Sequence, residues 1–314
     1  MLNASPALDP RKFTNPEVTA SGQRRAKVGL RALETLWFNT GTLCNLTCRN
    51  CYIESSPGND RLAYLKAAEV AGYLDEVAQR GWPVQTVGFT GGEPFMNPEI
   101  PPILSDTLAR GHTALVLTNA MRPMMRHADM LVALRRSAGA RLRVRVSIDH
   151  YGPALHQAER GPNTWAPALD GLRFLAGHGF APEVAGRMFS GEPEAAVRAG
   201  FARLFVEQGL PIDAADPVSL VLFPEMDAGA EVPEITTACW SILGRAPDSV
   251  MCASSRMVVR RLGSPRASVA ACTLLPYDLQ FDLGFTLAEA SRPVALNHPH
   301  CARFCVLGGA ACSR

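Results

Sequence analysis

The chain has 314 residues, of which 47% are apolar and 19% are charged, and its formal net charge is +2. This composition can bury a sizeable core, which excludes a disordered or collagen-like chain, and the charge balance gives no electrostatic reason to expect nucleic-acid or membrane binding. The sequence contains no uncharged apolar run near the roughly 20 residues that span a bilayer, and its N-terminus lacks the apolar segment of a secretion signal. We therefore expect a soluble, cytoplasmic protein of one large domain or two ordinary ones.

Strand and helix patterns alternate along most of the chain, after a polar segment at residues 1–30 that we expect to form a tail or a strap. Apolar segments predict strands at residues 34–39, 84–89, 113–118, 141–148, 183–189 and 218–223. Amphipathic segments between them predict helices at residues 63–80, 99–110, 124–136, 165–176 and 193–207. Such alternation is typical of a parallel sheet, either open and doubly wound or rolled into a barrel, and six repeats are too few for the eight-stranded barrel. In each arrangement we expect the functional site at the carboxyl ends of the strands.

The alternation stops near residue 225. Two short apolar segments, at residues 257–261 and 267–271, flank a Gly-Ser-Pro turn and predict a hairpin, and the chain after them is rich in loops. We place a boundary between residues 225 and 238, which gives a core over residues 31–225 and a small C-terminal domain over residues 226–314.

The cysteines fall into two groups. Three follow the first predicted strand, and the other six lie in the last quarter of the chain: Cys44, Cys48 and Cys51, then Cys239, Cys252, Cys272, Cys301, Cys305 and Cys312. A reducing cytosol disfavours structural disulfides, so clustered cysteines there more often bind metal or take part in catalysis. Three thiolates on one loop fit a zinc ion completed by a distant histidine, or a 4Fe-4S cluster with one iron open to an exogenous ligand.

The motif Cys44-x3-Cys48-x2-Cys51, followed by Tyr52, resembles the CxxxCxxC signature of the radical SAM superfamily. After the second predicted strand, Gly91-Gly92-Glu93-Pro94 resembles the GGEP motif of the same family, which contacts the amino group of the methionine moiety of S-adenosylmethionine (SAM). The agreement of the two motifs favours an iron–sulfur cluster over zinc. The resemblance implies an α/β fold, a partial (βα)6 TIM-like barrel with a small cysteine-rich C-terminal extension.

Further matches follow at the ends of the next strands. Thr118 and Asn119 end the third strand where relatives commonly have TNG, although Ala120 stands here for the glycine. Ser147 and Asp149 follow the fourth strand and resemble the SxD that lies near the ribose and carboxylate of SAM. An N-cap role in the following helix is the alternative for both residues.

Two arginines are also candidates for SAM binding. Arg160 lies in a stretch that resembles the hxxxRG of the same family branch, and Arg187 is on the fifth strand, where relatives place polar contacts to SAM. A structural ion pair is the alternative for each arginine. His150 replaces the usual glycine after the SxD aspartate, and it is either a site residue or a residue that only shapes its loop.

The C-terminal cysteines resemble those of SPASM/twitch extensions, which carry one or two auxiliary iron–sulfur clusters. Six thiols cannot ligate two four-cysteine clusters, so we expect one auxiliary 4Fe-4S cluster. The expected ligands are Cys252, Cys272, Cys301 and Cys305, with Cys312 as the competitor for the last place. A zinc knuckle is the alternative for this group. Cys239 is a free thiol, a hydrogen-atom donor near the substrate or a packing residue, and His298 and His300 beside Cys301 are ligands or donors to a ligand.

The resemblance implies that a reduced cluster on the first three cysteines passes one electron to SAM, which breaks into methionine and a 5′-deoxyadenosyl radical that abstracts hydrogen from a substrate. An external one-electron reductant, such as a flavodoxin or a ferredoxin, would supply that electron. We expect the substrate to be a peptide or protein, with radical dehydrogenation or rearrangement of a small molecule as the alternative. A non-catalytic iron–sulfur or zinc protein on a degenerate barrel is a third hypothesis. An ordinary Rossmann methyltransferase is disfavoured because no G-x-G-x-x-G follows the first strand.

Overall fold

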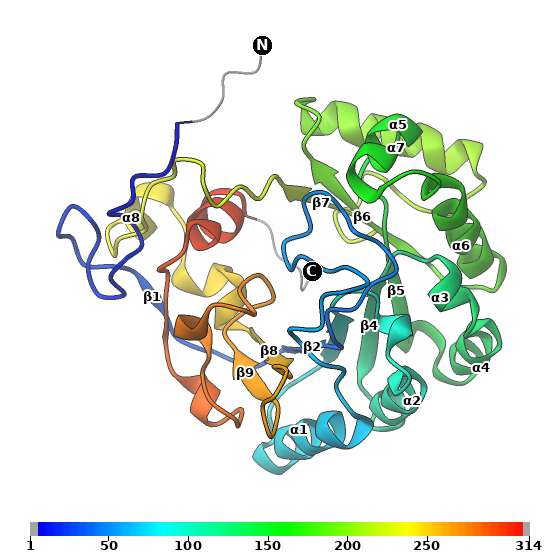
Figure 1. The fold of residues 1–314 in the computed structure, drawn as a ribbon, viewed down its shortest axis with the longest axis horizontal. Coiled ribbons are helices and arrows are strands. Elements are labelled where there is room, and N and C mark those ends of the chain that lie inside the picture. The colour runs from blue at the N-terminus through cyan, green and yellow to red at the C-terminus, as the bar shows by residue number, and fades with distance from the viewer. Residues whose placement is uncertain (1–5, 310–314) are drawn as a thin grey trace.

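The computed structural model describes residues 6–309 and is built around an eight-stranded sheet in the order β7-β6-β5-β4-β3-β2-β8-β9 (Figure 1). Its parallel strands include β2 (Thr35–Asn39), β3 (Thr86–Thr90), β4 (Thr113–Thr118), β5 (Leu142–Ser147), β6 (Glu183–Met188) and β7 (Leu220–Pro224). Each of the six strands predicted from the sequence is confirmed. The central strands are apolar and buried on both faces, as in other parallel sheets that helices cover.

The helices that follow the strands lie around the outside of the curved sheet (Figure 1). They are α1 (Ala67–Arg80), α2 (Ile100–Ala109), α3 (Arg122–Met125), α4 (Ala128–Ala138), α5 (Pro153–Arg160), α6 (Trp165–Gly177) and α7 (Glu194–Glu207). The prediction of one helix over residues 124–136 is wrong, because the backbone leaves the helical conformation at His127 (φ −107°, ψ 19°) and the His127 ring lies 5.9 Å from the Phe95 ring. The sequence did not predict α5, whose buried residues are the polar His156 and Glu159.

The C-terminal part extends the same sheet. The predicted hairpin is confirmed as β8 (Ser255–Val259) and β9 (Ser268–Ala270), and β8 also pairs in parallel with β2. The part of the chain after β7 further contains α8 (Cys239–Leu243), β10 (Val294–Ala295) and a π-helix, η7 (Cys301–Leu307). The 3-10 turns of the structure are Pro94–Met96, Gly139–Arg141, Pro247–Ser249, Met251–Ala253, Leu279–Phe281 and Glu289–Ser291.

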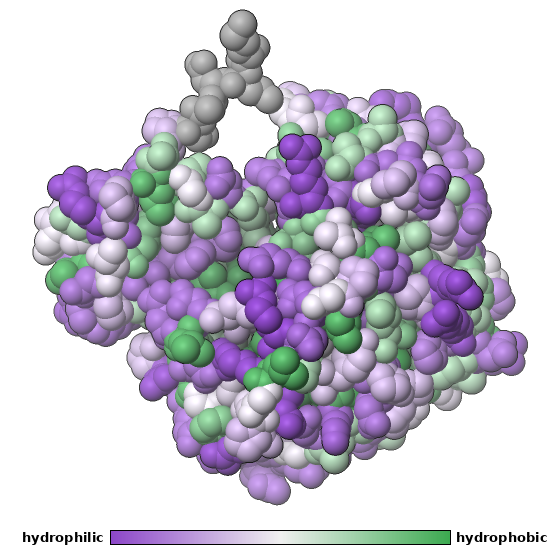
Figure 2. All heavy atoms as spheres, in the orientation of Figure 1, coloured by the Kyte–Doolittle hydropathy of each residue, from purple (hydrophilic) through white to green (hydrophobic). Residues whose placement is uncertain are grey.

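Another feature of the fold is the distribution of hydrophobic residues on the surface and along the helices. On the face drawn in Figure 2, hydrophobic residues are scattered among hydrophilic ones rather than gathered in one large patch. Within residues 6–309, none of the helices combines the length and the hydrophobicity that crossing a bilayer requires.

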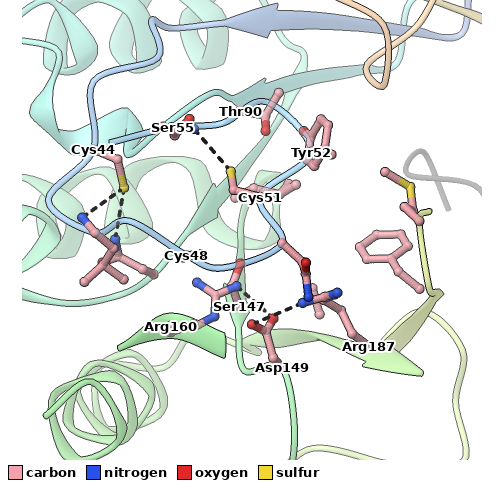
Figure 3. A pocket seen from close by; sticks show the side chains of 18 of the residues that line it. Cys44, Cys48, Cys51, Tyr52, Ser55, Thr90, Ser147, Asp149, Arg160 and Arg187 are labelled. Atoms are coloured by element: carbon pink, nitrogen blue, oxygen red, sulfur yellow. Dashed lines mark hydrogen bonds and ion pairs between the residues drawn. The ribbon is translucent and has the colours of Figure 1, made fainter. Parts of the chain in front are cut away.

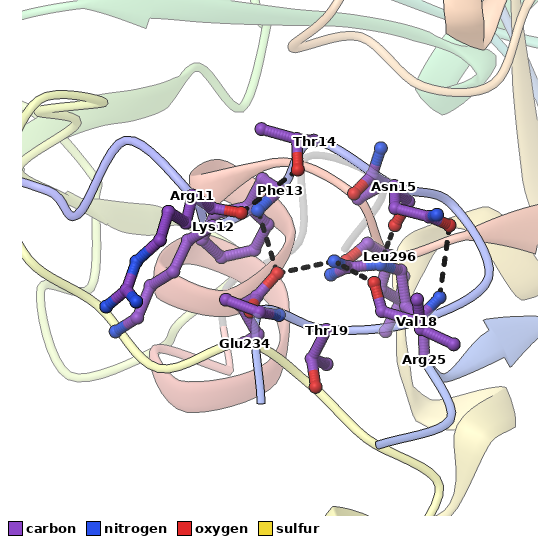
Figure 4. Close-up of polar contacts among 12 residues, drawn as sticks. Arg11, Lys12, Phe13, Thr14, Asn15, Val18, Thr19, Arg25, Glu234 and Leu296 are labelled. Carbon is purple, nitrogen blue, oxygen red and sulfur yellow. Dashed lines mark hydrogen bonds and ion pairs between the residues drawn. The ribbon is translucent and has the colours of Figure 1, made fainter. Parts of the chain in front are cut away.

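The N-terminal segment packs against the C-terminal part. Its strand β1 (Lys27–Val28) pairs antiparallel with β10, and the fully buried Arg25 donates from its guanidinium to the carbonyl oxygens of Asn15, Val18 and Leu296. Arg25 also forms an ion pair with Glu234 (Figure 4), whose carboxylate accepts the backbone N–H groups of Phe13 (2.7 Å) and Ala20 (2.6 Å). One buried ion pair therefore holds the N-terminal segment on the part of the chain that follows β7.

We expect Arg25→Met to lower the free energy of unfolding by about 3–5 kcal/mol, because it leaves the Glu234 carboxylate buried without its cation. The side chain of Glu234 is only 5% exposed, so water cannot replace the lost partner. Urea unfolding measures the change, and Arg24→Met at the neighbouring exposed position is the matched control. Equal stabilities of the two variants would contradict the importance of the pair.

Candidate active site

A cavity of about 180 Å³ lies at the carboxyl ends of the parallel strands (Figure 3). The structure brings most of the predicted core residues together around it: Cys44, Cys48, Cys51, Gly91, Gly92, Thr118, Asn119, Ser147, Asp149, Arg160 and Arg187. Glu93 and Pro94 are buried and do not belong to its lining. The residues come from a loop and several strand ends that are distant in sequence, so the fold alone makes them neighbours.

The three cysteines lie on the loop between β2 and α1, which we call the cysteine loop (residues 40–62). Backbone hydrogen bonds join it to the loop after β3: Gly92 N–H donates to Gly41 O (2.8 Å), and Glu93 N–H donates to Leu43 O (3.1 Å). A Cβ on Gly92 would lie 2.2 Å from Leu43 O. Gly91 has a φ of +140°, and a Cβ there would lie 2.4 Å from Gly41 O. The packing of these two loops therefore requires both glycines, whatever they do for a ligand.

The sulfur atoms of the cysteine loop accept hydrogen bonds from protein N–H groups. Leu46 N–H donates to Cys44 Sγ and Ser55 N–H donates to Cys51 Sγ, each at 3.4 Å. Burial raises the pKa of Cys44 to about 12, and burial also raises the pKa of Cys48.

This donor set fits an iron–sulfur cluster, because iron bound by thiolate removes the cost of burying a charged sulfur and N–H groups stabilise the ligated sulfur. Among residues 6–309, no three His, Cys, Asp or Glu side chains are arranged as ligands of a single metal ion. A cluster makes a different demand, since each of its thiolates binds a separate iron atom.

Glu93 lies beneath the cavity and ties the loop after β3 to the end of β4. Its carboxylate accepts hydrogen bonds from the Thr118 hydroxyl (2.8 Å), the Asn119 N–H (2.9 Å) and the Phe95 N–H (3.2 Å). Burial raises the pKa of Glu93 to about 7, although these three donors oppose the shift. A carboxyl group in this position keeps its proton to a higher pH than one in water does.

The predicted SxD residue and the two predicted arginines form one buried ionic network (Figure 3). Asp149 accepts a hydrogen bond from Arg160 (3.0 Å) and lies 4.0 Å from Arg187. Arg187 also binds Glu159 (2.7 Å) and Glu225 (3.2 Å). Both arginines thus form the ion pairs that were the alternative to SAM binding, and both still line the cavity.

Two questions left open by the sequence are answered here. The N-cap alternative for Ser147 and Asp149 is wrong, because α5 begins after Gly152 and no side chain caps it. His150 shapes its loop: its Nδ1 accepts the Gly152 N–H (2.9 Å), its Nε2 lies 2.9 Å from a Glu192 oxygen, and it does not line the cavity.

Ala120, which stands where relatives have glycine, adopts the left-handed φ of +57°. A glycine would adopt this conformation without the cost that a Cβ imposes, roughly 1–2 kcal/mol. The Ala120 carbonyl oxygen also packs against Gly171 of α6, because a Cβ added to Gly171 would lie only 2.1 Å from this oxygen. The alanine at position 120 therefore adds backbone strain at the end of β4 that the glycine of the family pattern would avoid.

Four of the C-terminal cysteines lie close to one another. Burial raises the pKa of Cys301 well above its usual value, and the nearby Cys272, Cys305 and Cys252 thiols act in the same direction. Cys301 and Cys305 are four residues apart on η7, so both can face one side of it. Cys312 lies outside the described residues.

The remaining C-terminal candidates have local roles. The sulfur of Cys239, at the start of α8, accepts the Thr236 N–H at 3.4 Å. Burial lowers the pKa of His298 to about 4 and also lowers that of His300. His300 N–H donates to His298 Nδ1 at 3.1 Å, so one lone pair of His298 is already used within the protein.

Sequence reasoning missed one wall of the cavity and part of its ionic network. The wall is apolar and comes from β7 and the C-terminal part: Phe223, Pro224, Met226, Leu274 and Phe304. The rings of Phe223 and Phe304 lie 5.6 Å apart, which joins β7 to η7. The missed network residues are Glu159 and Glu225. Glu159 stands directly before Arg160 in the motif that was recognised, whereas no sequence pattern marks the apolar wall.

Comparison with known proteins gives a family and a fold. A model of the radical SAM superfamily matches residues 38–194. The antilisterial bacteriocin subtilosin biosynthesis protein AlbA of Bacillus subtilis is 27% identical over 173 residues, which are 55% of this chain and 36% of AlbA.

Among solved structures, Streptococcus suis SuiB bound to S-adenosylmethionine matches with a TM-score of 0.59 and 12% identity, over 81% of this chain and 63% of SuiB. Native anSMEcpe with bound AdoMet matches with a TM-score of 0.57 and 14% identity, over 82% and 79% of the two chains. These likenesses confirm the expected partial barrel with a cysteine-rich C-terminal part. The chain spans little more than a third of the length of AlbA and under two thirds of SuiB.

We expect Gly92→Ala to separate the cysteine loop from the loop after β3, because its Cβ would meet the backbone oxygen of Leu43 at 2.2 Å. The midpoint of thermal unfolding should fall by several degrees, and the protein should retain less iron after anaerobic reconstitution. Gly58→Ala is the matched control, since Gly58 lies in the same loop and an added Cβ there meets nothing within 4 Å. Wild-type stability and iron content in Gly92→Ala would contradict the packing argument.

The raised pKa of Glu93 makes the stability of the cofactor-free protein pH-dependent. The folded state holds the Glu93 proton to a pKa of about 7, against 4.5 for an exposed glutamate, so the stabilisation present below pH 4.5 is lost as the pH rises to 7. The loss is on the order of 3 kcal/mol. Urea unfolding at pH 5 and pH 7.5 should show a smaller difference in Glu93→Gln than in wild type, whereas the exposed Glu207→Gln should behave like wild type. If the stability difference between pH 5 and pH 7.5 is the same in Glu93→Gln as in wild type, groups other than Glu93 cause the pH dependence.

Proposed function

The chain belongs to the radical SAM superfamily, and we propose that it cleaves SAM reductively and uses the resulting radical to modify a peptide. Membership of the family implies a 4Fe-4S cluster and SAM. The observation that carries the proposal is the single cavity lined both by Cys44, Cys48 and Cys51 and by the ends of β3 to β6. This arrangement does not favour the non-catalytic hypothesis, because a purely structural metal site does not require a pocket for SAM beside the cysteines.

We assign the ligands of the cluster and of SAM to the polar half of the cavity. Cys44, Cys48 and Cys51 hold the cluster, which when bound supplies the electron that breaks SAM into methionine and a 5′-deoxyadenosyl radical. The segment Gly91–Pro94 is assigned to the methionine amino group: Gly91 and Gly92 line the cavity, and Thr118 and Asn119 hold the Glu93 carboxylate in place beneath it.

The ribose and carboxylate of SAM are assigned to a second set of cavity residues: Ser147, Asp149, Arg160 and Arg187. The ion pairs among Asp149 and the two arginines fix these side chains before SAM arrives. Fixed donors cost no reorganisation at the moment of reaction.

The apolar half of the cavity is assigned to the substrate. Phe223, Met226 and Phe304 present hydrocarbon surface opposite the cysteine loop and exclude water from the radical. This surface fits an apolar side chain of a peptide better than a charged small molecule. AlbA is described as a bacteriocin biosynthesis protein, and SuiB has been solved with the precursor peptide SuiA, which also favours a peptide substrate.

We further propose one auxiliary 4Fe-4S cluster in the C-terminal part, residues 226–314, beside the radical SAM core at residues 31–225. Its ligands are Cys252, Cys272 and Cys301, with Cys305 or Cys312 as the fourth. Leu274 and Phe304, which neighbour these cysteines in sequence, line the cavity, so the auxiliary site would lie behind the substrate wall. An external flavodoxin or ferredoxin is the proposed reductant.

Iron content and SAM cleavage test this proposal together. Anaerobically reconstituted wild type should hold about eight irons and release 5′-deoxyadenosine with dithionite, and the Cys44/Cys48/Cys51→Ala variant should hold about four and release none. A Cys252/Cys272→Ala variant should also hold about four but retain cleavage of SAM without substrate, whereas Cys239→Ala should keep the wild-type iron. Four irons in wild type, falling to none without the first three cysteines, would contradict the auxiliary cluster alone. Iron without any cleavage would contradict the enzymatic function.

A further inference from the structure

We propose that Glu159 is a positioning residue that clamps the cysteine loop and thereby fixes the Cys48 and Cys51 thiols relative to β6. The inference rests on the proposed function, because it concerns the loop assigned to the SAM-binding cluster. Glu159 lies in the last turn of α5 and touches neither the cavity nor the thiols, so it would act through the residues that it holds.

The contacts of Glu159 join three separate segments. Its Oε2 accepts hydrogen bonds from Asn50 Nδ2 (2.9 Å) and from the Arg187 guanidinium (2.7 Å), and its backbone oxygen accepts the Arg49 N–H (2.7 Å). Asn50 stands between Cys48 and Cys51 in the cysteine loop, and Arg187 stands on β6. A single residue of α5 therefore connects the cysteine loop to the sheet.

Burial and charge explain why this contact is strong. The Glu159 side chain is only 7% exposed, and a buried carboxylate is tolerated where cations and N–H groups surround it. Arg187 has other acidic partners, since Glu225 lies 3.2 Å and Asp149 4.0 Å away. Loss of the Glu159 carboxylate would leave Arg187 paired, whereas it would take from Asn50 the partner that the structure gives its side chain.

The clamp acts at residues 49 and 50 of the loop, and other contacts hold the loop on either side of them, such as the hydrogen bond from the Tyr277 hydroxyl to Ile53 O (2.8 Å). The segment near Cys44 is held from the opposite side, where Glu93 N–H donates to Leu43 O and Asn119 Nδ2 donates to Asn45 Oδ1 (2.9 Å). Three thiolates bind one cluster only at fixed separations, so both ends of the loop must be held. A displacement of about 1 Å in such a site can reduce a rate by roughly a hundredfold.

Hydrogen exchange of the cofactor-free protein tests the clamp without any activity. We expect amides of residues 44–55 to exchange about tenfold faster in Glu159→Ala, with little change elsewhere, because a buried hydrogen bond to a charged group is lost. Glu159→Gln should stay near wild type, since its amide oxygen can still accept from Asn50. Glu225→Ala is the matched control, because it removes a partner of Arg187 that lies outside the loop.

The reconstituted protein gives the second readout. Per loaded cluster, Glu159→Ala should cleave SAM about tenfold more slowly than wild type and give a broadened electron paramagnetic resonance signal with SAM, and Glu159→Gln should restore both. Unchanged exchange at residues 44–55 in Glu159→Ala would overturn the clamp, as would equal loosening in Glu225→Ala or a normal cleavage rate per cluster. If wild type loads iron but cleaves no SAM, the proposed function fails, and the exchange data still decide whether Glu159 holds the loop.

Discussion

The site depends on the close contact between the cysteine loop and the loop after β3. Two backbone hydrogen bonds and two glycines without room for a Cβ bring these loops together. The contact exists because β2 and β3 are neighbours in the sheet, with Asn39 paired opposite Thr90 at their carboxyl ends. Main-chain hydrogen bonds and glycine packing therefore fix residues 41–43 against the loop after β3, and side-chain contacts such as that of Glu159 with Asn50 hold the loop farther along.

Around this contact the fold places buried charges that balance one another. Asp149 follows β5, Glu159 and Arg160 lie on α5, and Arg187 lies on β6; the two carboxylates are buried and the two arginines largely so, and an unpaired charge in such a place would cost several kcal/mol. Their pairing keeps the polar half of the cavity rigid, and the apolar half from β7 and η7 closes it. In the proposed function the two halves have different roles: the charged groups would hold the polar cofactor, and the hydrocarbon walls would exclude water from the carbon radical.

The parts of this fold that the sequence predicted are those with strong local patterns. The strands β2 to β7 are apolar runs between turn signals, and the core site follows from cysteine spacing and a glycine motif. Helix α5 was not predicted because it buries the polar His156 and Glu159 and exposes the apolar Leu155. An amphipathic helix normally buries its apolar residues and exposes its polar ones. The contact of Asn50 with Glu159 could not be predicted either, because the two residues are 109 positions apart and no local sequence pattern marks such a pair.

The pairing of β8 with β2 is the largest feature that local patterns could not show. Parallel neighbours more than 200 residues apart in the chain carry no turn signal, and the sequence indicated only a hairpin beyond a boundary.

This pairing has a structural consequence for the two cysteine groups. Ser255, three residues after Cys252, pairs with Thr35 at the amino end of β2, while the cysteine loop leaves its carboxyl end. The five residues of β2 span roughly 16 Å, at about 3.3 Å per residue. The register of this strand pair therefore sets how far Cys252 lies from the cysteine loop along the sheet, because both positions are tied to the ends of β2.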